Sequence, residues 1–169
     1  SVLTSDDLPV SWRATPIVHL GPIAQEVSPA LAQVFATALV GVTPQGWFRQ
    51  WDDQGSVSFA DWQDASLVLD AVDIVVLSME DLAHDRDKLA RYVRQARVLV
   101  LTMGARGATV YHKGQTTRVP AFAVTEIDPT GAGDVFATAF LIRYAETEDL
   151  LEAARFANCT ASFVIEGMN

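Results

Sequence analysis

The chain has 169 residues, half of them apolar, and carries a formal net charge of −9 at pH 7. This length and composition predict one domain with a substantial hydrophobic core. The negative charge argues against nucleic acid or an anionic membrane as a partner, because neither is attracted by the summed field of the chain.

Other features of the composition exclude further classes of function. Cys159 is the single cysteine, so the chain forms no internal disulfide and no cysteine metal cluster, and we interpret it as a buried, inert thiol. No stretch has the apolar length of a membrane span, and the first residues lack a secretory signal pattern. We therefore expect a cytoplasmic protein.

The first half of the chain predicts alternating strands and helices. Residues 1–15 show no clear period and are interpreted as an irregular lead-in. Apolar runs at 16–20 and 39–42 predict buried parallel strands, and the spacing of apolar residues over 28–38 predicts a helix between them. His19, inside the first run, is either a ligand or proton carrier, or a hydrogen-bonded structural group.

The segment 43–51 stands out because it places polar and aromatic side chains directly after a predicted strand end. Ligands of open α/β sheets gather beyond the carboxyl ends of strands, so Gln45, Arg49 and their neighbours are candidates for substrate or lid contacts. The alternative is a loop anchored by the burial of Trp47 and Trp51. Residues 56–59 then predict a short edge strand after a turn.

The second half continues the alternation. The patterns predict a helix at 61–71 capped by Asp61, a buried strand at 73–78, another helix opening at residue 79, and a helix at 87–96. They also predict a strand at 98–102, a hairpin of residues 108–112 and 116–119, and a last helix opened by Glu148. Together these elements predict a three-layer αβα fold, with a mostly parallel sheet and helices on both faces.

A glycine-containing turn before the apolar run 135–142 is typical of a helix start that binds an anion. Its residues are Asp128, Pro129, Thr130, Gly131, Ala132, Gly133 and Asp134. The first amides of a helix have no intrahelical acceptor, so they can converge on a phosphate. Asp134 would then act as a general base toward a hydroxyl that attacks a phosphoryl group. The alternative is a tight connection with a capping aspartate.

The seven-residue string 128–134 resembles the signature of the PfkB family of carbohydrate kinases, which have the ribokinase-like fold. The resemblance implies that Gly131, Ala132 and Gly133 form the anion hole for the transferred phosphate. It also implies that Asp134 is the catalytic base.

A second string resembles the nucleotide-binding part of the same family. Thr102, Gly104 and Gly107 follow the predicted strand 98–102 in a Thr-x-Gly-x-x-Gly pattern, which implies that they line the nucleotide. A late helix packs against the adenine in the family, which nominates Asn158 and Ser162 as neighbours of the base. Asn158 is alternatively an internal polar group that hydrogen-bonds to backbone.

The resemblance implies ATP and Mg²⁺ as cofactors, with a monovalent cation as a further candidate. The family places an Asn-x-x-Glu motif where this chain has Ser78-Met79-Glu80-Asp81, so the asparagine is replaced and the acid is shorter. Carboxylates at a strand end still suit Mg²⁺, which makes Glu80 and Asp81 the candidate ligands. Alternatively, both acids only occupy the first turn of a helix.

As a whole, the resemblance implies ATP-dependent phosphotransfer to an alcohol group of a sugar or polyol. The strings 45–49 and 119–122 resemble the branch that includes plant inositol kinases. The resemblance also implies that the chain corresponds to the nucleotide-binding and catalytic half of the family, and we expect that the N-terminal part with the sugar-binding residues is missing. We also expect pairing with a second copy through an exposed sheet edge. The alternatives are an inactive nucleotide-binding or regulatory module and a purely structural fragment.

Overall fold

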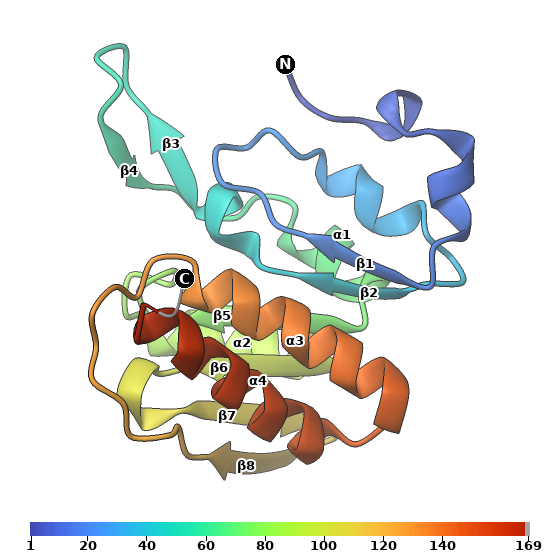
Figure 1. Cartoon of the computed structure of the whole chain (residues 1–169). Coiled ribbons are helices and arrows are strands. Elements are labelled where there is room, and N and C mark those ends of the chain that lie inside the picture. Colours follow the sequence, from blue (N-terminus) through green and yellow to red (C-terminus); the bar gives the residue numbers. More distant parts are fainter. Residues whose placement is uncertain (168–169) are drawn as a thin grey trace.

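The structure is a computed structural model that describes residues 1–167. Its centre is a six-stranded sheet in the order β1-β2-β5-β6-β7-β8 (Figure 1). The strands from β1 to β6 pair in parallel, whereas β7 and β8 add an antiparallel hairpin at one edge. These strands are β1 Ile17–Leu20, β2 Leu39–Val42, β5 Ile74–Ser78, β6 Val98–Thr102, β7 Ala108–His112 and β8 Gln115–Val119.

Helices cover both faces of this sheet, which confirms the predicted three-layer α/β fold. The helices α1 (Ala65–Ala71) and α2 (Arg86–Gln95) pack on one face, and α3 (Ala132–Thr147) and α4 (Leu150–Ile165) pack on the other (Figure 1). Alternate side chains of β5 and β6 enter two separate apolar cores, as the pleat of a strand requires. Val75, Leu77, Leu99 and Leu101 lie in the first core, and Ile74, Val76, Val98 and Val100 lie in the second.

Several predicted helix boundaries were wrong, because local side-chain hydrogen bonds set the starts of the helices. Asp85 accepts hydrogen bonds from two amides of the first turn of α2, so residues 79–81 do not open a helix. Asp149 caps α4 in the same way, and Glu148 ends α3 with a left-handed φ of 54°. Asp61 does not cap α1; it forms an ion pair with Lys88.

The lead-in and the segment after β1 also differ from expectation. Residues 28–38 form only a short 3₁₀ helix, η3 (Pro29–Gln33), instead of a longer α-helix. The lead-in contains two further 3₁₀ helices, η1 (Ser5–Asp7) and η2 (Val10–Ala14). Leu3 pairs in parallel with Val27, which ties the lead-in to the segment after β1.

The segment 43–51 combines a buried anchor with a projecting ribbon. It forms the 3₁₀ helix η4 (Pro44–Phe48), in which Trp47 is buried and stacks on Trp62 at 5.5 Å between ring centroids. The strands β3 (Arg49–Trp51) and β4 (Val57–Phe59) follow as an antiparallel hairpin that projects from the main body (Figure 1). Aromatic burial therefore explains Trp47, whereas Trp51 is exposed.

The approach of α3 to the sheet depends on a glycine in β2. A Cβ atom added at Gly41 would lie 2.5 Å from Cδ2 and 2.6 Å from Cδ1 of Leu141. Leu141 belongs to α3 and is almost fully buried, so it has little room to move away. The missing side chain of Gly41 therefore sets how closely α3, and its first turn, can approach the carboxyl end of β2.

Replacing Gly41 by alanine should destabilise the protein by about 1–3 kcal/mol, because the new methyl group overpacks the contact with Leu141. Denaturant unfolding followed by circular dichroism measures this change. Gly133→Ala is the matched control, since its added Cβ meets no protein atom within 4 Å and helical alanine is favoured over glycine. Equal stability of the Gly41 variant and the wild type would show that this contact does not hold α3.

Candidate active site

The loop before α3 is fixed by hydrogen bonds at both of its sides. The amides of Ile127 and Asp128 both donate to the carbonyl of Ile165, at 2.9 and 3.2 Å. The Asp128 carboxylate accepts the amide of Thr130 at 2.9 Å, and hydrogen bonds from the hydroxyl and amide of Thr130 lower the pKa of Asp128. Gly131 then takes a left-handed φ of 79° as the N-cap of α3, a conformation that glycine adopts without strain.

The predicted anion-binding amides are only partly free. The amide of Ala132 donates to the carbonyl of Pro129 at 3.1 Å, so in this structure it does not serve as an anion donor. Within residues 1–167, the amides of Gly131, Gly133 and Asp134 have no backbone or side-chain acceptor. The turn therefore offers fewer of the predicted donors, because the amide of Ala132 is engaged. The backbone amide of Asp134 is a further donor that was not predicted.

These amides border a cavity of about 250 Å³ at the carboxyl ends of the parallel strands. Asp134 is exposed to solvent and lines this cavity. The other polar lining groups come from the last residues of β5 and β6 and from the segments that follow β2 and β5. The cavity is lined by Thr43, Gln45, Val76, Leu77, Ser78, Asp81, Thr102, Pro129, Gly131, Gly133 and Asp134.

A second cavity of about 500 Å³ adjoins the first, and Thr102, Pro129 and Gly133 line both. Its walls are formed by the turn after β6, the loop 121–126 and one side of α4. The structure thus brings the two strings picked out from the sequence into adjoining cavities. Small and apolar side chains predominate, with Gly104, Ala105, Gly107, Ala121, Phe122, Ala123, Val124, Phe136, Ala161 and Ile165 beside Glu126, Asn158 and Ser162.

The two glycines after β6 are required for different reasons. Gly107 has a φ of 86°, and a Cβ there would lie 2.1 Å from the carbonyl oxygen of Val119. Its glycine is therefore needed by the fold, because the backbone of the chain itself occupies the space. Gly104 has a φ of 54° and faces open space, so it alone matches the expectation of a backbone left bare toward the cavity.

Asn158 is a buried side chain that holds two elements together. Its amide nitrogen donates to the carbonyls of Val119 at 3.3 Å and Pro120 at 3.1 Å, which ties α4 to the end of β8. This geometry supports the alternative of a polar group that hydrogen-bonds to backbone. Ser162 donates to the carbonyl of Cys159 at 2.6 Å, and Cys159 is half-buried instead of fully buried.

Of the two candidate metal ligands, only Asp81 lines the cavity. Its Oδ2 accepts hydrogen bonds from the amide of Ser78 at 2.7 Å and from the hydroxyl of Ser78 at 2.8 Å. Glu80 is exposed and is not among the lining residues. Residues 1–167 hold no group of three or more acidic, histidine or cysteine side chains suited to a metal ion. The cavity fits a cation such as Mg²⁺ that takes most of its ligands from phosphate and water.

His19 lies beside this cavity and uses both ring nitrogens. Nε2 is 3.0 Å from Oγ1 of Thr43, and Nδ1 is 3.1 Å from Oγ1 of Thr138 on α3. Burial lowers the pKa of His19, and the charge of Asp134 opposes this shift. The structure supports the hydrogen-bonded alternative for His19. Thr43 belongs to the segment 43–51 that the sequence singled out, whereas Thr138 was not predicted, although its place one turn after Asp134 was the available signal.

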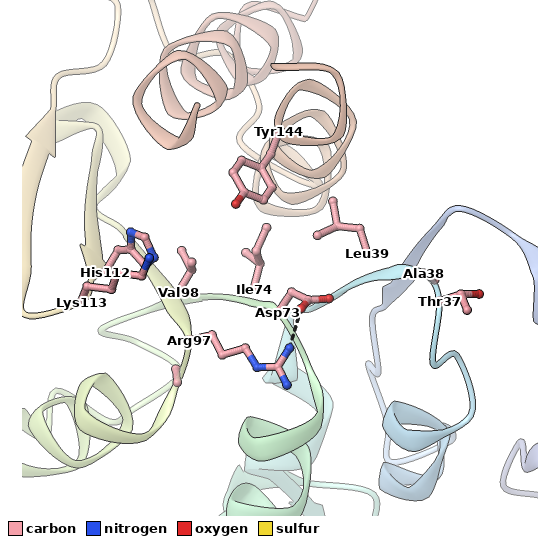
Figure 2. A pocket seen from close by; sticks show the side chains of 11 residues that line it. Thr37, Ala38, Leu39, Asp73, Ile74, Arg97, Val98, His112, Lys113 and Tyr144 are labelled. Carbon is pink, nitrogen blue, oxygen red and sulfur yellow. Dashed lines mark hydrogen bonds and ion pairs between the residues drawn. The ribbon is translucent and has the colours of Figure 1, made fainter. Parts of the chain in front are cut away.

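A further hollow lies at the opposite, amino end of the strands and contains none of the predicted site residues. It has a volume of about 710 Å³ and is lined by Thr37, Leu39, Arg97, His112, Tyr144 and their neighbours (Figure 2). The guanidinium of Arg97 pairs with Asp73 at 2.8 Å (Figure 2). The second oxygen of Asp73 accepts the amide of Val40, so both carboxylate oxygens are engaged in holding strand starts together.

Residues 1–167 contain no helix long and apolar enough to cross a membrane.

Comparison with known proteins assigns this chain to a family. Residues 57–169 match the family described as pfkB family carbohydrate kinase. A fructokinase from Escherichia coli is 32% identical over 161 residues, which are 86% of this chain and 51% of that protein. An inositol 3-kinase from Arabidopsis thaliana is 35% identical over 68 residues, 40% of this chain and 19% of that protein. The chain thus spans about half the length of the fructokinase.

Solved structures show the same fold. A pyrophosphate-dependent kinase of the ribokinase family, in a sulfate complex, has a TM-score of 0.81 at 19% identity, over 97% of this chain and 61% of that one. The nucleoside kinase of Methanocaldococcus jannaschii has a TM-score of 0.67 at 24% identity, over 90% of this chain and 50% of that one. With its ribokinase-like fold and the match over two thirds of its length, the chain belongs to the pfkB family of carbohydrate kinases.

Proposed function

We propose that this chain carries the nucleotide-binding and catalytic part of a kinase that transfers the γ-phosphoryl group of ATP to an alcohol of a sugar or polyol. The observation that carries the proposal is the pairing of free amides with a carboxylate in one cavity. The amides of Gly131 and Gly133 and the side chain of Asp134 border the same 250 Å³ space. A larger, mostly apolar cavity adjoins it and suits the rest of a nucleotide.

In the proposed reaction, Asp134 takes the proton of the acceptor hydroxyl as its oxygen attacks the γ-phosphorus. The bond between that phosphorus and the bridging oxygen of ADP breaks, and ADP leaves with the electron pair. Asp134 lies in the first turn of α3, where the helix dipole favours a negative charge. Free amides at the same helix start stabilise the charge on the phosphoryl oxygens as they move.

The adjoining cavity supports the proposed nucleotide site by its shape and chemistry. Its apolar walls, which include Phe122, Phe136 and Ala161, would bury the faces of a planar base. Gly104 leaves bare backbone in the wall of this larger cavity. Asn158 contributes mainly by fixing α4 against β8, so the wall of the cavity keeps its shape when a ligand binds.

Asp81 is the residue proposed to hold Mg²⁺, with phosphate oxygens and water as its other ligands. When bound there, the ion would neutralise part of the charge on the phosphates. Ser78 orients Asp81 by donating to one of its carboxylate oxygens. Glu80 has no part in this proposal, because it does not line the cavity. A monovalent cation stays a further candidate.

Thr43 and Gln45 are the groups proposed to meet the acceptor, since they line the Asp134 cavity from the β2 side. A sugar or polyol is the proposed acceptor class because the two relatives named above for their sequence identity are a fructokinase and an inositol kinase. We further propose that the reaction takes place in the cytoplasm. Strand β1 forms one edge of the sheet, and we propose it as the edge through which two copies would pair.

One observation favours a second candidate, an inactive nucleotide-binding or regulatory module. The Ser78-Met79-Glu80-Asp81 string departs from the family pattern, and one oxygen of Asp81 already accepts two hydrogen bonds from Ser78. A module of this kind would bind a nucleotide but would not transfer phosphate. The variants below distinguish the two candidates.

Asp134→Asn should lower the turnover of the protein that contains this chain by about 10²–10⁴-fold, because the amide cannot accept the hydroxyl proton. Nucleotide affinity, measured by isothermal titration calorimetry, should change little. Asp87→Asn, in the first turn of α2, is a matched control away from the site and should keep full turnover. Equal loss of turnover and nucleotide binding in the Asp134 variant would indicate a structural role instead.

Gly133→Ala should weaken the binding of ATP, because its methyl group meets no protein atom and therefore enters the space of the phosphates. The methyl group would push the phosphate away from one of the amides that bind it. The hydrogen bond lost to a charged group corresponds to about 1.5–3 kcal/mol, or roughly 10–100-fold in Kd. Adenosine has no phosphate, so its affinity should fall less than that of ATP and serves as the control for effects on the larger cavity, which Gly133 also lines. Parallel titrations with pyrophosphate test whether the phosphate cavity binds phosphate groups that carry no nucleobase. Unchanged ATP affinity would contradict the proposed anion site.

Asp81→Asn should raise the Mg²⁺ concentration needed for half-maximal ATP binding, because the amide keeps the hydrogen bonds from Ser78 but loses the charge. A Mg²⁺ titration at fixed ATP measures this shift. The adjacent Glu80→Gln removes the same charge outside the cavity and should leave the titration unchanged. A larger shift for the Glu80 variant would reverse the assignment of the two acids.

A further inference from the structure

We propose that His19 is a positioning residue that sets the hydroxyl of Thr43 against the catalytic cavity and ties it to the helix that carries Asp134. The inference rests on the proposed function for its kinetic consequences. His19 does not itself line the cavity, and it contacts no substrate in this proposal. It acts through Thr43, which lines the cavity together with Asp134.

The two contacts of the His19 ring, to Thr43 and to Thr138, form a bridge that joins two strands of the sheet to the helix packed on them. His19 lies in β1 opposite Gly41 of β2, and Thr43 follows the end of β2. One ring nitrogen contacts Thr43 at 3.0 Å, and the other contacts Thr138 at 3.1 Å. Thr138 comes four residues after Asp134, so both belong to the same face of α3. The imidazole therefore links the β2 end of the cavity to the helix face of the base.

The chemistry of the ring decides what Thr43 offers to a ligand. A neutral imidazole has one donor and one acceptor nitrogen, and a threonine hydroxyl can serve either of them. If Nε2 donates, the Thr43 proton is free to meet a phosphoryl oxygen. If Nε2 accepts, Thr43 gives its proton to the ring and presents a lone pair to an acceptor hydroxyl. In both tautomers, His19 fixes which role remains for Thr43.

Protonation of His19 would change this arrangement. Burial lowers the pKa of His19 from its ordinary value of 6.5, and Asp134 on α3 is the charged group that acts against this shift. The other two partners, Thr43 and Thr138, are neutral. A protonated ring donates from both nitrogens, so Thr43 must accept and can no longer donate to the ring. Acid therefore removes one of the two arrangements open to the neutral bridge.

The same pKa shift has a defined effect on stability. The unfolded chain binds a proton at His19 more readily than the folded chain does. The contribution of His19 to stability is therefore complete above pH 6.5 and falls as the pH drops from there toward the lowered pKa of the folded state. Replacement of His19 by a group that does not titrate removes this pH dependence. That change is a readout separate from turnover.

Two conservative variants separate the two halves of the bridge. The amide of Gln at position 19 reaches about as far as Nε2 and can keep the contact with Thr43. The amide of Asn reaches about as far as Nδ1 and can keep only the contact with Thr138. We expect His19→Asn to lower kcat about tenfold with nearly unchanged ATP affinity, whereas His19→Gln keeps most of the turnover and loses the acid limb of the pH profile.

The test measures kcat and KM from pH 5 to 8 with ATP and Mg²⁺, and with fructose, ribose and myo-inositol as acceptors, beside the unfolding midpoint of each variant. Thr43→Val should lower kcat as much as His19→Asn, and the double variant should lose no more than either alone. Equal losses of kcat in the Asn and Gln variants, in step with their losses of stability and without a change in the pH profile, would overturn the proposal.

A spectroscopic readout keeps the inference testable if no acceptor is phosphorylated. The ¹⁵N signals of the His19 ring should report a neutral ring at pH 7. They should shift when pyrophosphate and Mg²⁺ bind to the wild type, but not when they bind to Thr43→Val. Absence of turnover with a ligand-dependent shift would count against the proposed function alone. Bound pyrophosphate without any shift of the His19 signals would count against the bridge.

Discussion

The site depends on one constraint: α3 must begin at the carboxyl end of the sheet with free amides and Asp134 facing a cavity. Gly131 provides the left-handed turn that starts the helix, and Gly41 lets α3 approach β2 closely enough for its first turn to reach the strand ends. Neither glycine contributes a side chain to the chemistry. Together they place backbone donors and a carboxylate where the ends of β2, β5 and β6 supply the polar groups that complete the cavity.

Much of the architecture follows directly from the sequence. The apolar runs in β5 and β6 are continuous because these strands are covered on both faces, so their positions were predicted within one residue. The residues at which the helices start were harder to predict from the sequence. Asp61, Asp64 and Asp85 all resemble caps in the sequence, but Asp61 is engaged in a tertiary ion pair with Lys88, whereas Asp85 accepts two local amides and caps α2.

In the candidate site, too, the segments involved were predicted from the sequence, whereas the roles of single residues were not. The strings 102–107 and 128–134 were both singled out by their resemblance to one family, and the structure brings them to adjoining cavities. The reasons for individual residues were not accessible from spacing. Gly107 is required by the carbonyl of Val119 instead of by a ligand, and the amide of Ala132 is taken by Pro129. Backbone contacts between segments far apart in the chain produce both results, so a local motif cannot reveal them.

The hydrogen bonds to Ile165 give the last turn of α4 an influence on chemistry that occurs elsewhere. A single carbonyl oxygen accepts the amides of both Ile127 and Asp128, and Asp128 in turn orders the turn that leads into α3. Fraying of the final helical turn would release this carbonyl and loosen the segment that leads to Asp134. The rigidity of the turn that carries Asp134 therefore depends on the last turn of α4 staying helical.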